Sequence, residues 1–102
     1  MKNLVMIVPA GAQQNIADAL RGLEQLQGFT FTRVEGHGSQ AENDPFLSAR
    51  DKVVGYTPWI RVDLLLEDAD VDAVLAALRT TGHGLEGRGV YWVTAVEKNG
   101  RL

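Results

Sequence analysis

Hydrophobic residues follow the spacing of a β-strand in four segments of the chain. A continuous apolar run over residues 4–8 is closed by Pro9 and Gly11, as is typical of a strand buried on both faces near the middle of a sheet. Residues 29–35 and 90–96 are rich in β-branched and aromatic side chains. Between residues 60 and 66 every second residue is aliphatic. These patterns predict four strands.

Two further segments follow the spacing of an amphipathic helix. The first carries apolar residues between polar ones and is expected to end at Gly28; these residues are Ile16, Leu20 and Leu23. The second is expected to be capped by Asp68 or Asp70 and to end near residues 81–82; its apolar residues are Val71, Val74, Leu75 and Leu78. The predicted order of elements is therefore β-α-β-β-α-β.

This order predicts an α+β, ferredoxin-like domain with a four-stranded antiparallel sheet and both helices on one face. The other face is left uncovered. The third strand is expected to present an apolar and charged mixture on it: Trp59, Arg61, Asp63, Leu65 and Glu67. The second strand adds either Phe29 and Phe31 or the set Thr30, Thr32 and Val34. Such a mixture favours a subunit interface, and the alternative is a face shielded by the chain's own loops.

Composition narrows the class of protein. The 102 residues, with 45% hydrophobic content, predict a single domain over residues 1–102. A net charge of -3 argues against nucleic acid as a partner, and the chain has no cysteine for a disulfide, a thiolate metal site or a nucleophile. No apolar run approaches the roughly 20 residues of a membrane span, so we expect a cytoplasmic protein without membrane insertion. Ser39 and Ser48 lack a nucleophile motif, and we expect no enzyme.

A long connection over residues 39–54 separates the second and third strands. A plain hairpin needs only about 2–5 residues, so an insertion of this length suggests a function. Phe46, Leu47 and Arg50 are candidate contacts for a partner protein. In the alternative interpretation, the two apolar residues fold back onto the sheet.

A glycine-rich connection over residues 81–89 precedes the last strand. It holds four glycines and Arg88, which would suit a phosphate or carboxylate ligand, although it could also be a simple turn. His37 and His83 also lie in glycine-rich turns, with Glu35 and Glu86 nearby in sequence. Two imidazoles and a carboxylate would suit Zn²⁺ or Cu²⁺, but a histidine in a turn is more often a surface residue.

Three stretches resemble the PII signal-transduction proteins: "YTPWIRVDLLLEDADVDAVLAAL" at residues 56–78, "VEGHGSQ" at 34–40 and "GRGVYWV" at 87–93. The resemblance covers nearly the whole chain and implies a homotrimer with inward-facing sheets and ATP or ADP in clefts between subunits. Residues 39–54 correspond to the family's T-loop. The candidate ligand-binding residues that it implies are Gly36, His37, Gly38, Gln40, Gly87, Arg88, Gly89 and Arg101. Ser39 and Val90 stand where the family carries basic residues.

The sequence also resembles a divergent, short-T-loop PII-like group that occurs beside heavy-metal efflux pumps. This resemblance implies a non-enzymatic regulator or adaptor that senses a small ligand and presents residues 39–54 to a membrane transporter. The CutA-type proteins share the fold and imply an alternative, a metal-binding trimer that uses His37 and His83 and has no signalling role.

Overall fold

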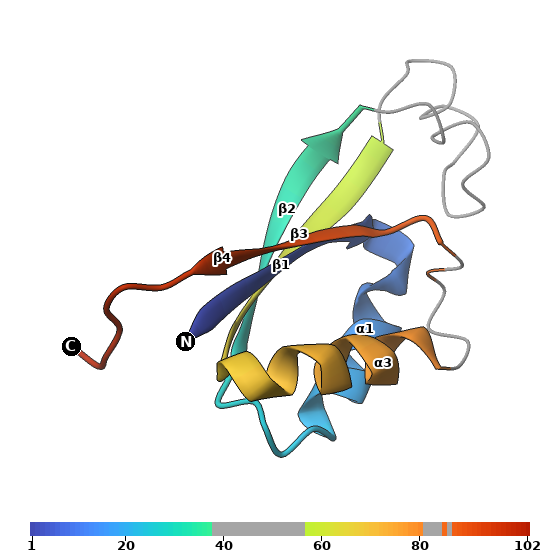
Figure 1. Ribbon diagram of the computed structural model, residues 1–102. Coiled ribbons are helices and arrows are strands. Elements are labelled where there is room, and N and C mark those ends of the chain that lie inside the picture. Colours follow the sequence, from blue (N-terminus) through green and yellow to red (C-terminus); the bar gives the residue numbers. More distant parts are fainter. Residues whose placement is uncertain (38–56, 81–84, 86) are drawn as a thin grey trace.

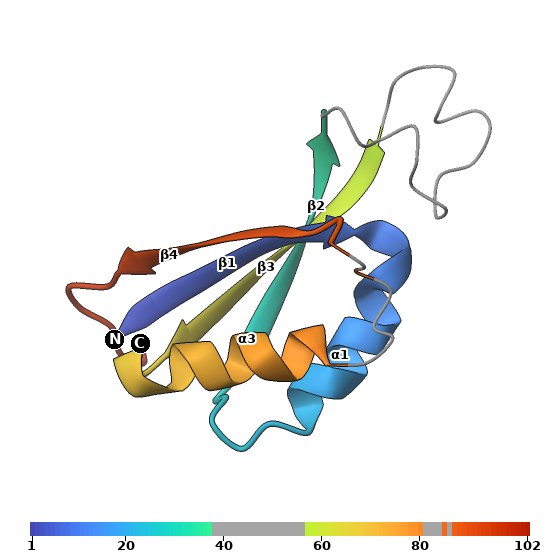
Figure 2. The ribbon, with the colours of Figure 1, turned by 45° about the vertical axis from the view of Figure 1, so that its right-hand side comes forward.

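The computed structural model describes residues 1–37, 57–80, 85 and 87–102. Four strands form one sheet: β1 (Lys2–Pro9), β2 (Phe29–Gly36), β3 (Thr57–Leu66) and β4 (Val90–Ala95). Their order across the sheet is β2-β3-β1-β4, and every neighbouring pair is antiparallel. The helices α1 (Gln13–Arg21) and α3 (Val71–Arg79) lie on one face (Figures 1 and 2). The ferredoxin-like fold predicted from the periodicities is confirmed.

Short 3-10 turns lead into both helices, at Ala10–Ala12 and Asp68–Asp70. The first helix is shorter than its pattern predicts, because the chain leaves the helix at Gly22 and Leu23 packs against the core from outside it. The predicted capping by an aspartate side chain is wrong. Asp70 occupies the N-cap position of α3 without a side-chain hydrogen bond, and Asp68 instead pairs with the amino-terminal ammonium at 2.8 Å.

The core lies between the sheet and the helices. Alternate residues of β1 and β3 point into it and meet the apolar stripes of α1 and α3, and its largest buried side chains include Leu4, Ile16, Leu20, Ile60, Leu64, Leu66 and Val74. Burial of one such side chain stabilises the fold by about 1.5–3 kcal/mol. The predicted position of the first apolar run is also confirmed, because β1 is a central strand and Val5, on its other face, is buried too.

The open face of the sheet is the side without helices. The pairing of β2 with β3 resolves the alternative left by the sequence: Phe29 and Phe31 lie opposite Leu64 and Val62 and pack on the core. Thr30, Thr32 and Val34 therefore belong to the open face, because side chains alternate along a strand. They join Trp59, Arg61, Asp63 and Leu65 there.

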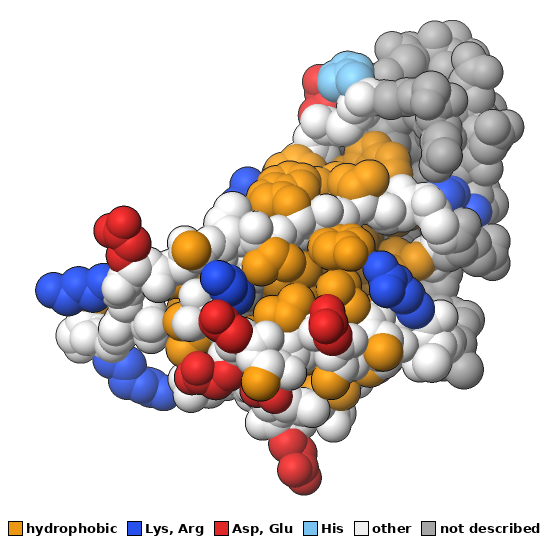
Figure 3. Space-filling view, in the orientation of Figure 1, with side chains coloured by type: hydrophobic (Ala, Val, Ile, Leu, Met, Phe, Trp, Pro, Cys, Tyr) orange, Lys and Arg blue, Asp and Glu red, His pale blue; other side chains and the backbone are white. Residues whose placement is uncertain are grey.

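The helices leave the edge strand β4 uncovered. All of its side chains are exposed, including Tyr91 and Val93, whose register with Met6 and Leu4 places them on the helix side. Figure 3 shows hydrophobic side chains at the surface between β4 and α3. No helix in the described ranges is both long and apolar enough to cross a membrane.

Candidate functional site

The two glycine segments singled out in the sequence lie at the same end of the sheet but at opposite edges. Gly36 ends β2 and His37 follows it, whereas Gly87–Gly89 lead into β4. Register places both segments at the end of the sheet where β1 ends at Pro9. Because β3 and β1 lie between the edge strands, the two segments are separated by roughly three strand spacings, or about 14 Å. One chain therefore does not bring them together.

Gly36 is required by a close approach of Trp59. A Cβ atom at this position would overlap the Cγ, Cδ1 and Nε1 atoms of the Trp59 indole. The half-buried indole thus lies against the backbone at the end of β2, on the open face, where β3 places it opposite Val34. The sequence pattern indicated a glycine turn here, but it did not reveal that an aromatic ring covers it.

His37 is paired with a carboxylate from its own strand end. Its Nε2 atom lies 2.9 Å from Oε2 of Glu35, and both side chains are exposed. This pair supplies one nitrogen and one oxygen donor. No cluster of three or more metal-ligating side chains occurs among residues 1–37, 57–80, 85 and 87–102. His83, the second predicted ligand, lies outside these ranges.

The turn before β4 also depends on its glycines. Gly87 has φ of +78°, a left-handed conformation that side chains with a Cβ rarely adopt. A Cβ on Gly89 would lie 3.3 Å from Cγ1 of Val8, so this residue packs tightly on β1. Between them, Arg88 donates its backbone N–H to the carbonyl oxygen of Leu85 at 2.7 Å, and its Nε atom is buried. Residues 87–89 therefore form a tight turn that holds a guanidinium group close to the sheet edge.

Arg101 lies at the other end of the sheet. It borders a cleft of about 690 Å³ together with Asn3, Gly28 and Asp63, near the beginnings of β1 and β2. Within one chain it therefore does not join Gly36 or Gly87. The remaining predicted residues lie outside the described part of the chain: Gly38, Gln40, Phe46, Leu47 and Arg50.

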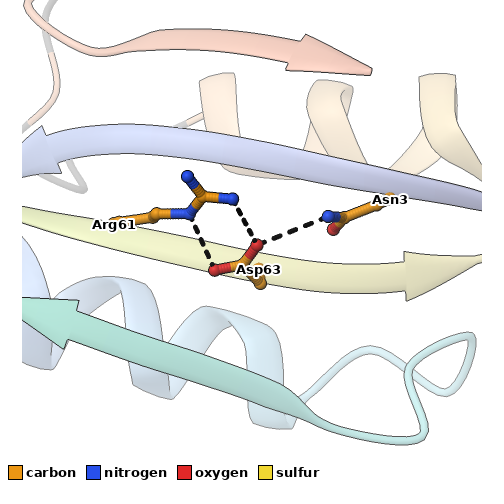
Figure 4. A network of polar contacts seen from close by, with 3 residues as sticks. All are labelled: Asn3, Arg61 and Asp63. Carbon is orange, nitrogen blue, oxygen red and sulfur yellow. Dashed lines mark hydrogen bonds and ion pairs between the residues drawn. The ribbon is translucent and has the colours of Figure 1, made fainter. Parts of the chain in front are cut away.

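A polar cluster on the open face was only partly foreseen (Figure 4). Arg61 donates from Nε and Nη2 to the two carboxylate oxygens of Asp63, each at 3.1 Å, and Asn3 Nδ2 donates to Asp63 Oδ1 at 3.4 Å. The hydrogen bonds from Arg61 hold the pKa of the Asp63 carboxyl below its ordinary value, and Asp63 in turn raises the pKa of Arg61. The signal in the sequence was two opposite charges two residues apart on one strand face.

Apolar groups lie beside this cluster on the open face. The guanidinium carbon of Arg61 lies 6.0 Å from the centroid of a Trp92 ring, and Leu65 on the same face is 47% exposed. A charge that already has its partner costs less to bury than an unpaired charge. Another subunit could therefore cover the open face at a lower energetic cost, because Arg61 and Asp63 already pair with each other.

Comparison with known proteins places the chain in a family. The family described as protein of unknown function (DUF3240) matches residues 1–102. A solved structure of a DUF3240 family protein from Shewanella baltica OS155 superposes with a TM-score of 0.72 at 23% identity, over 99% of this chain and 94% of that one. This likeness supports the same fold.

Curated relatives point to a regulatory class. The nitrogen regulatory protein P-II of Rhizobium meliloti is 29% identical over 99 residues, covering 96% of this chain and 88% of the relative. The protein of the same name from Rhizobium leguminosarum bv. viciae is 32% identical over 74 residues, covering 72% of this chain and 67% of the relative. The chain therefore belongs to the DUF3240 family, as a divergent member of the PII-like proteins.

Proposed function

We propose that this chain is a PII-like regulatory protein that forms a homotrimer and binds a small anionic ligand, such as ATP or ADP, between subunits. It would act without catalysing a reaction. Its relatives named nitrogen regulatory protein P-II support the regulatory class. The candidate ligand contacts in each chain are Gly36, His37, Gly38, Gln40, Gly87, Arg88, Gly89 and Arg101.

The observation that carries the proposal is the placement of the two glycine segments. They lie at one end of the sheet on opposite edges, β2 and β4. In a closed ring of identical subunits, two different surface patches of each copy meet, one on each neighbour. We take these patches to include the two edges of the sheet, so that the β2 edge of one copy faces the β4 edge of the next. A trimer would then bring residues 36–37 of one subunit toward residues 87–89 of its neighbour, three times over.

The output of the regulator would be residues 39–54. In this proposal the loop, through Phe46, Leu47 and Arg50, contacts a membrane transporter from the cytoplasmic side, and a heavy-metal efflux pump is the transporter class that we favour. Ligand would shift the loop between two states. Such a shift requires that the ligand bind the two states with different affinity.

Native mass spectrometry of metal-stripped protein tests the proposal directly. Spectra would be recorded for the protein alone, with ATP or ADP plus Mg²⁺, and with Zn²⁺ or Cu²⁺. We expect a trimer that gains up to three nucleotides. A trimer that gains no nucleotide at concentrations up to the millimolar range would contradict the proposed ligand class.

Variants of the turn before β4 localise the binding. Gly87→Val combined with Arg88→Ala should lower nucleotide affinity at least tenfold, because it strains the turn and removes a cation. Arg88→Ala alone should weaken binding without straining the backbone. The matched control is Gly28→Val with Arg33→Ala, since Gly28 has open space around it and Arg33 is exposed. If both double variants bound nucleotide with equal affinity, the nucleotide site would not include the turn before β4.

The contact between His37 and Glu35 favours one alternative, a CutA-like protein that binds a divalent metal ion without signalling. Two donors 2.9 Å apart at an exposed strand end could contribute to a site for Zn²⁺ or Cu²⁺, completed by His83. In the same spectra, this alternative predicts uptake of metal but not of nucleotide. Replacing His37 and His83 together with Ala should then abolish metal uptake.

A further inference from the structure

A cavity of about 240 Å³ lies between α3 and β4, on the helix side of the sheet. We call it the helix-side pocket. Its walls are mostly apolar: Met6 and Val8 come from β1, Leu75 and Leu78 from α3, and Tyr91 from β4. The helices leave the edge strand β4 uncovered, because its helix-side residues Tyr91 and Val93 are 47% and 39% exposed. The pocket lies where α3 and this uncovered strand face each other.

A cation from α3 borders this apolar pocket. Arg79, the last residue of α3, lies with its guanidinium carbon 5.5 Å from the centroid of the Tyr91 ring. The ion pairs found within the described ranges involve other basic groups, namely the amino terminus, Lys2, Arg21, His37 and Arg61. Within residues 1–37, 57–80, 85 and 87–102, the guanidinium of Arg79 therefore contacts an aromatic ring and no carboxylate.

We propose that the helix-side pocket binds a small organic acid with a compact apolar or aromatic body. An apolar cavity of about 150 Å³ can hold a benzene molecule, so this pocket has room for a ring and a short carboxylate arm. The ring would lie among Met6, Leu75 and Leu78, and the carboxylate would accept charge-assisted hydrogen bonds from Arg79. A cationic ligand of the same shape would face the guanidinium and be rejected.

This site differs from the proposed nucleotide site. It lies on the helix side of the sheet, and neither Met6 nor Arg79 belongs to the nucleotide set. The two sites adjoin at Gly87 and Gly89, which also border the pocket. Binding of an acid in the pocket can therefore be measured whether or not the protein binds nucleotide.

The chain carries a convenient reporter, because Met6 is one of only two methionines. Full-length protein labelled with ¹³C at the methionine methyl groups would be titrated with phenylacetate, and Met6→Leu assigns the signals. We expect the Met6 methyl resonance to shift saturably with phenylacetate, and phenethylamine to cause no saturable shift. We also expect Arg79→Gln to weaken phenylacetate binding about tenfold, as loss of one charge-assisted contact does.

Arg33→Gln serves as the matched control, because it removes the same charge from another exposed position. It should leave the affinity for phenylacetate unchanged. The proposal is overturned by any of three results: no saturable Met6 shift with up to about 10 mM phenylacetate, equal binding of phenylacetate and phenethylamine, or equal affinity in wild type and Arg79→Gln. Arg79 is exposed, so its replacement is expected to leave the fold intact.

Discussion

At the scale of single residues, two glycines of the candidate site are needed for different physical reasons. Gly36 is needed because the Trp59 indole lies where a Cβ would be, whereas Gly87 is needed because its φ is +78°. The sequence shows only that both positions hold glycine, so it does not distinguish these two reasons. They lead to different expectations for substitution, since one involves a side-chain neighbour and the other the backbone itself.

The first prediction concerns Gly36→Ala. The added methyl group must displace the Trp59 indole, so we expect a loss of about 1–3 kcal/mol in the free energy of unfolding, as is typical of overpacking. Thermal unfolding followed by circular dichroism measures the loss, and tryptophan fluorescence follows the indole. Gly28→Ala is the control, because nothing lies within 4 Å of a Cβ there. Equal melting temperatures for the two variants would refute the role assigned to Trp59.

At the scale of elements, β3 carries both the core and the open face. Its aliphatic residues at every second position face the helices, while Arg61 and Asp63 form an ion pair on the opposite side. The hydrogen bonds from Arg61 lower the pKa of Asp63 relative to its ordinary value. A carboxyl whose pKa is lower in the folded state stabilises the fold above its unfolded-state pKa, and this stabilisation is lost as pH falls through the folded-state pKa.

A pH-dependent difference in stability therefore follows for Asp63→Asn. At pH 7 we expect the variant to be less stable by up to about 1 kcal/mol, as for partly exposed ion pairs. The difference should shrink as pH falls below about 4, where the unfolded-state carboxyl of wild type protonates. Urea unfolding at a fixed protein concentration between pH 7 and pH 2.5 measures it, with Glu24→Gln as the control, because Glu24 is exposed and takes part in none of the ion pairs of the described residues. A difference that does not change with pH would exclude this ion pair as its source.

At the scale of the whole molecule, the open face and the two edge strands have to be considered together. Leu65 and Trp92 are exposed on the open face at 47% and 42%, beside the ion pair between Arg61 and Asp63. The candidate ligand residues lie at the margins of the same sheet. Both features are consistent with the proposed trimer, in which residues 36–37 of one copy lie near residues 87–89 of the next.

Assembly can be tested with a charge placed on this face. Light scattering after size-exclusion chromatography should give about three times the 11.1 kDa chain mass for wild type. Leu65→Glu should shift the population toward smaller species, because burial of an unpaired charge costs several kcal/mol. Ala73→Glu adds the same charge to an exposed position of α3 and should leave the trimer unchanged. A wild-type monomer, or a Leu65→Glu trimer, would count against the proposed interface.

The sequence by itself determined the order of strands and helices and the buried side of β3 and of both helices, because periods of 2 and 3.6 residues record which side of an element faces the core. It placed the helix ends less well: α1 stops at Arg21 although Leu23 continues the apolar spacing, since tertiary packing can bury a residue outside a helix. Only the tertiary structure decided which side chains of β2 face the core, that Trp59 covers Gly36, and that Arg101 lies far from Gly87. These relations depend on strand register and on contacts between residues distant in sequence, which no local pattern encodes.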